Sequence, residues 1–237
     1  MLKLLKRHAT RICTPDQIDL EEHYQSRAEH TADLVVHVVV LTLAAVGGIV
    51  LAVLAALYAG VGAVAATAIY ALCLVAMLTV STVYNQTRPC AARPILRRMD
   101  EAAIFLMIAG SYTPFTTQRF EGGWAIGFTL VVWAVAFSGV AAKLVAPRIS
   151  DAFWSVVYAL FGWLSVIALK PLLDTVHPVA LGLLLLGGLI YTAGVFVFIS
   201  PQVKFRRAIW HGFVVVGAGV HWAAVLVGVV LAPVAAG

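Results

Sequence analysis

Charged residues are scarce in this chain of 237 residues: they make up 11% of it, whereas hydrophobic residues make up 62%. A soluble globular domain carries roughly 25% charged and roughly 45–50% apolar residues. Surface-to-volume scaling limits the apolar surface that a water-soluble protein of this size can bury. The composition therefore excludes a soluble globule, a disordered tail and a coiled coil, and it indicates a polytopic membrane protein.

Cysteine is also scarce, with only Cys13, Cys73 and Cys90, and no C-x-x-C motif is present. A zinc knuckle, a redox couple or a disulfide-stapled domain needs paired cysteines, so all three are excluded. The net charge of +5 does not form a basic patch, because the basic residues lie in short segments between apolar runs. We therefore expect no nucleic-acid partner.

Seven apolar stretches qualify as helices that cross a bilayer, which needs about 20 residues each, although the third and the fifth are short. They are Leu34–Tyr58, Val61–Tyr84, Ala102–Thr117, Trp124–Leu144, Phe153–Leu169, Val179–Ile199 and Ala208–Leu231. Turn-forming glycines and prolines separate most of them. The sequence thus predicts an all-α fold with an N-terminal segment over residues 1–33 and one seven-helix transmembrane domain over residues 34–237.

The basic residues predict the orientation of these helices. All but two of the 16 lysine and arginine residues lie in the segments on one side of the predicted spans; the exceptions are Arg119 and Lys170. Loops rich in Lys and Arg stay in the cytoplasm. We expect a cytosolic N-terminus and a C-terminus on the outer side.

Polar side chains gather near the cytoplasmic ends of four predicted helices. They are the i, i+4 pairs Asp33/His37, Ser81/Asn85 and Arg207/His211, and the adjacent acids Asp100 and Glu101. Ionisable groups in or beside a span are costly and often functional, and residues at i and i+4 share a helix face. The pattern predicts one site in the inner leaflet, although Asp33 and Asp100 also suit N-caps and Arg207 suits a membrane anchor.

Several motifs resemble the hemolysin III family, the bacterial branch of the progestin and adipoQ receptor (PAQR)-like superfamily. The main match is the string from Asp100 to Phe115, followed by Gly162-Trp163-Leu164, Gly187 to Tyr191, and Ala208 to His211. The resemblance implies a seven-helix, N-inside protein of the bacterial inner membrane whose partners are membrane lipids. Homo-oligomerisation is left open.

Superfamily members are known or presumed to bind zinc through three histidines, one on the second helix and two on the seventh. Ser81, Asp100 and His211 match the family's serine, its aspartate and its last histidine, whereas Asn85 and Arg207 replace the other two ligands. Asparagine is a poor zinc ligand and arginine is a permanent cation. The family's three-histidine site therefore cannot assemble.

Two arrangements remain for these polar groups. In the first, Arg207 supplies positive charge in place of the metal and pairs with Asp100 or Glu101, so that no cofactor is expected. In the second, a rearranged set drawn from His37, His211, Asp100, Glu101 or Asp33 binds a divalent ion such as zinc.

Three functions fit this interpretation. The resemblance favours a non-hydrolytic membrane protein with a channel-forming, cytolytic or membrane-homeostasis role, although no predicted span carries a full polar stripe. A PAQR-type hydrolase of lipid amides or esters is the alternative; in it Asp100 acts as base, Ser81 as hydrogen-bond partner and His211 as metal ligand. A lipid-sensing, receptor-like protein is the third.

Overall fold

The computed structural model describes residues 24–145 and 149–232, and all regular structure in these residues is helical. The α-helices are α2 (Arg27–Tyr58), α3 (Val61–Gln86), α4 (Arg93–Gln118), α5 (Gly122–Val145), α6 (Asp151–Gly162), α7 (Leu169–Thr175), α8 (Pro178–Phe198) and α9 (Arg206–Val225). A 3₁₀ turn, η2 (Trp163–Val166), follows α6, and a π-helical turn, η3 (Leu226–Val230), follows α9.

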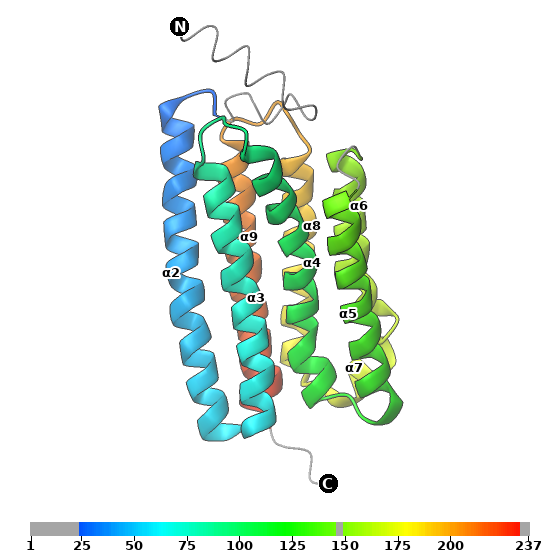
Figure 1. Cartoon of the computed structure of the whole chain (residues 1–237). Helices are drawn as coiled ribbons and strands as arrows, with labels where there is room; N and C mark the ends of the chain where they lie inside the picture. The colour runs from blue at the N-terminus through cyan, green and yellow to red at the C-terminus, as the bar shows by residue number, and fades with distance from the viewer. Residues whose placement is uncertain (1–23, 146–148, 233–237) are drawn as a thin grey trace, which may run out of the picture.

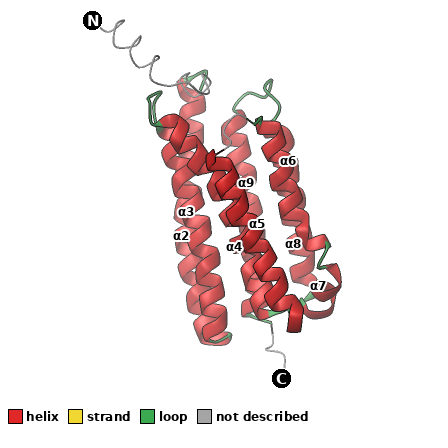
Figure 2. Cartoon of the chain, turned by 45° about the vertical axis from the view of Figure 1, so that its right-hand side comes forward, coloured by secondary structure: helices red, strands yellow, loops and turns green. Residues whose placement is uncertain are grey.

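The long helices run alongside one another in alternating directions (Figures 1 and 2). The first residues of α2, α4, α6 and α9 therefore lie at the same end of the bundle as the last residues of α3, α5 and α8. Every polar pair that the sequence places near a helix end comes from this one end.

An all-helical membrane architecture is confirmed. Five helices in the described residues are long and apolar enough to cross a membrane, and a bent pair raises this number to six. The helix α4 has 26 residues but is not among them, because it combines its apolar residues with Arg97, Asp100 and Glu101. Of the predicted N-terminal segment, residues 1–23 lie outside the described residues, and α2 already begins at Arg27.

The predicted fifth span, residues 153–169, is not one continuous helix. The segments Asp151–Val166 and Leu169–Thr175 meet at a bend of 52°. The hydroxyl of Tyr112 on α4 lies at this break: it is 2.7 Å from the Gly162 carbonyl oxygen, and it accepts a hydrogen bond of 2.9 Å from the Ser165 amide. Irregular backbone at membrane depth is tolerated where protein groups satisfy it, and Tyr112 does so here.

The helices turn polar residues inward and apolar residues outward. On α2 the buried positions begin with Asp33 and His37, whereas Val35, Val38 and Leu43 are each more than half exposed. Large exposed apolar surfaces of this kind face lipid rather than water. The polar groups of the bundle are therefore surrounded by protein.

Close helix packing depends on small residues at the contacts, as in other membrane bundles. Gly139 on α5 faces Phe105 on α4, and a Cβ at Gly139 would lie 2.4 Å from the ring. Phe105 is only 1% exposed and is enclosed by Trp154, Tyr158 and Phe161, so its ring has no room to move.

We expect Gly139→Ala to destabilise the protein by about 1–3 kcal/mol, the usual cost of overpacking. Thermal unfolding in detergent measures this effect. Gly127→Ala is the matched control on the same helix, because a Cβ there meets nothing within 4 Å. Equal melting temperatures for the two variants would contradict the packing described for α4 and α5.

Candidate functional site

The helix α2 begins earlier than the sequence predicts, because the side chains of Ser26 and Glu29 accept hydrogen bonds from backbone amides at its start. The Ser26 hydroxyl accepts a hydrogen bond from the Glu29 amide, and the Glu29 carboxylate accepts one from the Gln25 amide. Asp33 therefore lies in the second turn of α2 and is not its N-cap. Asp100 does not cap α4 either, because that helix begins at Arg93.

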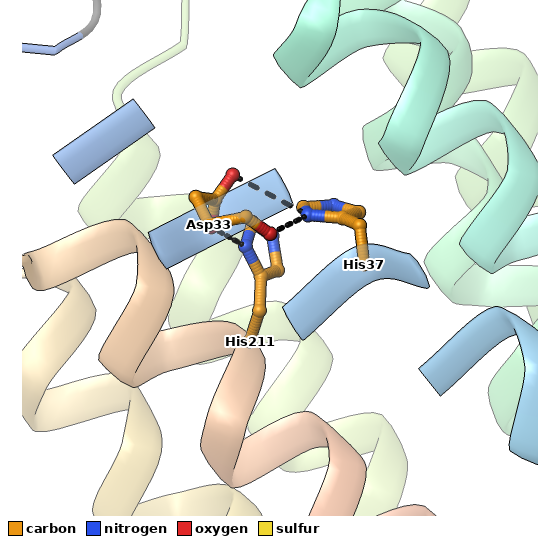
Figure 3. Close-up of side chains that lie close together, drawn as sticks. All are labelled: Asp33, His37 and His211. Carbon is orange, nitrogen blue, oxygen red and sulfur yellow. Dashed lines mark hydrogen bonds and ion pairs between the residues drawn. The ribbon is translucent and has the colours of Figure 1, made fainter. Parts of the chain in front are cut away.

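Asp33 and His37 on α2 meet His211 on α9 in a buried cluster (Figure 3). Nδ1 of His211 lies 2.6 Å from Oδ1 of Asp33. Nδ1 of His37 lies 2.9 Å from the backbone carbonyl oxygen of Asp33 and 3.3 Å from its Oδ2. The two imidazole rings contact edge to face, with their centroids 4.1 Å apart.

Tyr24, just before α2, completes the surroundings of this carboxylate. Its hydroxyl donates a hydrogen bond of 2.5 Å to Oδ2 of Asp33. Burial, followed by the hydrogen bond to Asp33, raises the pKa of Tyr24, so the phenol stays protonated and acts as a donor. The sequence does not predict the contact of Tyr24, because this residue lies outside every apolar run. Its separation of nine residues from Asp33 is also not a helical spacing.

A second polar group joins α3 to α9. The Arg207 guanidinium donates a hydrogen bond of 3.0 Å to Oδ1 of Asn85. The Asn85 amide nitrogen donates in turn to the Ser81 carbonyl oxygen at 3.0 Å, and its distance to the Ser81 hydroxyl is 3.4 Å.

The expected ion pair between Arg207 and Asp100 or Glu101 is wrong, because the guanidinium bonds to Asn85 instead. Glu101 belongs to a separate network on α4, α5 and α6. It pairs with Arg97 at 2.8 Å and with Lys143, while Arg97 also pairs with Asp151. The sequence predicts Lys143 only as one of the basic residues on the cytoplasmic side, but it is 3% exposed and its ammonium lies over the Trp154 ring.

A cavity of about 620 Å³ lies inside the bundle, within the size range of small-molecule sites. Its polar end is formed by six of the predicted site residues: Ser81, Asn85, Asp100, Glu101, Arg207 and His211. The rest of its wall is mainly apolar and includes Ile108, Phe115, Leu181 and Val214. Asp33 and His37 are not part of the wall; their contact with the cavity is through His211.

The fold and this site together define a helical multi-pass membrane protein with an internal, mainly apolar cavity that is polar at one end. The profile of the family described as "Haemolysin-III related" matches residues 25–222. The chain therefore belongs to the hemolysin III family of the PAQR-like superfamily.

Curated relatives come from bacteria and mammals. The chain is 33% identical over 160 residues to the "Hemolysin-3 homolog" of Bacillus subtilis, covering 67% of this chain and 74% of that protein. It is 31% identical over 160 residues to "Hemolysin-3" of Bacillus cereus, covering 67% and 72%. It is 28% identical over 203 residues to the human "Monocyte to macrophage differentiation factor", covering 83% of each chain.

The residues at the family's zinc positions do not fit zinc in this chain. Of the three positions, only His211 carries a ligand side chain. At the other two, a permanent cation is hydrogen-bonded to an amide oxygen, Arg207 to Asn85, so the contact between α3 and α9 forms without a metal.

We expect Tyr24→Phe to lower the melting temperature by about 5 °C, because a hydrogen bond to a charged group contributes about 1.5–3 kcal/mol. Thermal unfolding of the purified protein measures the shift. Tyr58→Phe is the control, since Tyr58 is 64% exposed at the far end of α2. If both variants melt like the unmodified protein, Tyr24 does not stabilise the Asp33 carboxylate.

Proposed function

We propose that the chain crosses the bacterial inner membrane seven times, with its N-terminus in the cytosol. In this topology α4 is one span and the bent segment from α6 to α7 is another. The surroundings of the polar residues of α4 support its assignment, because Glu101 pairs with Lys143 and Asp100 lines the cavity. The bias of Lys and Arg toward the segments at the polar end supports the orientation.

Cysteine labelling tests this topology. Cys90 is exposed between α3 and α4, at the proposed cytosolic end. In a Cys13→Ser/Cys73→Ser background, a membrane-impermeant maleimide should label Cys90 in inverted inner-membrane vesicles and not in right-side-out spheroplasts. The control carries Glu121→Cys as its only cysteine, in the loop before α5, and should show the opposite pattern. Labelling of Cys90 from the outer side would overturn the orientation.

We further propose that the protein binds an acyl-chain lipid inside the bundle and does not hydrolyse it through the family's zinc site. The observation that carries this proposal is the cavity itself, whose wall is mainly apolar and whose acidic and basic side chains lie at one end. Charged side chains at one end of a mainly apolar wall suit an amphiphile, with its chain along the apolar wall and its head group near Arg207 and Asp100. A membrane-homeostasis or lipid-sensing role follows from such binding.

The other functions have less support. One relative carries the printed name "Hemolysin-3", but cytolysis through a pore needs a continuous polar path. The cavity instead has a mainly apolar wall below its polar end. Zinc-dependent hydrolysis needs three protein ligands and an open position for water, and the pairing of Arg207 with Asn85 opposes this arrangement at the family's positions.

A fluorescent long-chain fatty-acyl amide tests the lipid proposal in detergent-solubilised protein. We expect saturable binding and recovery of the intact amide. Ile108→Trp, which fills the cavity, should weaken binding about tenfold or more, equivalent to about 1.4 kcal/mol. Leu106→Trp is the control on the same helix, because Leu106 does not line the cavity.

Two results would contradict the lipid proposal. The first is equal binding by the Ile108→Trp and Leu106→Trp variants, which would place the probe outside the cavity. The second is cleavage of the amide by the unmodified protein, because the proposal assigns it binding without turnover.

A further inference from the structure

The cluster of Asp33, His37 and His211 has the composition of a metal site. Each residue offers one ligand atom, and the three atoms lie within 4.8 Å of one another. Two imidazole nitrogens and one carboxylate oxygen are a donor set that zinc accepts in proteins, with water in the remaining position. All three residues are buried, so this donor set is shielded from bulk water.

Hydrogen bonding within the cluster leaves one buried atom unsatisfied. Nε2 of His37 has no hydrogen-bond partner among the described residues, and the residue is 1% exposed. A buried polar atom without a partner costs about 1–3 kcal/mol. Mutual hydrogen bonding alone therefore does not account for both imidazoles in this position.

The charge of the cluster also favours a cation. The Asp33 carboxylate has no exposed surface, and its partners are Tyr24, His37 and His211. No lysine or arginine within residues 24–145 and 149–232 forms an ion pair with it. A buried carboxylate needs a compensating charge, so the cluster requires either a protonated imidazole or a bound cation.

We propose that Asp33, His37 and His211 bind a divalent cation of the zinc class between α2 and α9. This site shares only His211 with the family's zinc positions and takes its other two ligands from α2. Tyr24 holds the Asp33 carboxylate through Oδ2 and is the outer-shell partner that orients this ligand.

A cation at this position has two structural effects. It joins the first and last described α-helices through residues that are 178 positions apart in the chain. It also fixes the orientation of His211, which lines the polar end of the cavity. Two of the three proposed ligands, Asp33 and His37, do not line the cavity, so zinc binding and lipid binding are measured separately.

The test uses the full chain, purified in detergent, stripped of metal with a chelator and then titrated with Zn²⁺. We expect one zinc ion to be retained per chain after desalting and a rise in melting temperature of about 5 °C at saturating zinc. Tyr24→Phe should weaken binding roughly 10- to 100-fold, as loss of an outer-shell partner does. His37→Gln should abolish retention.

His221→Gln is the matched control, because it removes another histidine from the same helix that is not part of the cluster. It should retain zinc, and so should Asn85→Ala. Retention by His37→Gln together with loss in Asn85→Ala would place the ion at the family's positions and overturn the proposal. The proposal would also be overturned if unmodified protein retained no zinc but still unfolded in one sharp thermal transition, which shows that it is folded.

Cobalt substitution provides a measurement that does not depend on variant folding. Unmodified protein loaded with Co²⁺ should show the visible absorption of a four- or five-coordinate site, whereas a spectrum identical to aqueous Co²⁺ would overturn the proposal. The fatty-acyl amide is measured in the same samples. If the protein binds the fatty-acyl amide but no zinc, only the metal proposal is overturned. If it binds zinc but not the fatty-acyl amide, only the lipid proposal is overturned.

Discussion

The buried carboxylate of Asp33 is the group on which the polar end of the bundle depends. In an apolar surrounding, a charged group must be compensated within the protein. Asp33 therefore collects partners from three places in the chain: Tyr24 before α2, His37 one turn further along it, and His211 on α9. These contacts bring the ends of α2 and α9 together and direct one imidazole toward the cavity.

The departures from the family's zinc positions are connected in space. Asn85 and Arg207 are far apart in sequence, yet each is the other's hydrogen-bond partner across α3 and α9. The resemblance implies that both positions carry ligands to one ion in other members, where the metal would link the helices. Here a cation and an amide oxygen link them directly.

Much of the architecture could be predicted from the sequence, because apolar length and the i, i+4 rule act locally. They placed Asp33 with His37, Ser81 with Asn85 and Arg207 with His211 at one end of the bundle, where the structure has them. They did not predict the partner of Arg207, the network around Lys143 or the contact of Tyr24, because these depend on how helices distant in sequence pack. The break after α6 was also missed, because its apolar residues suit a continuous helix.

The hydroxyl of Tyr112 couples the shape of one helix to the contents of the cavity. It lies within 3.2 Å of the carbonyl oxygens of Phe161 and Gly162. Tyr112 and Gly162 line the cavity wall, whereas Phe161 does not. A continuous helix would satisfy such carbonyls by itself, whereas here a side chain from a neighbouring helix does so. Any guest that displaces the Tyr112 ring must therefore offer its own donor or straighten the backbone. The bend after α6 thus depends on a side chain that also forms part of the cavity wall.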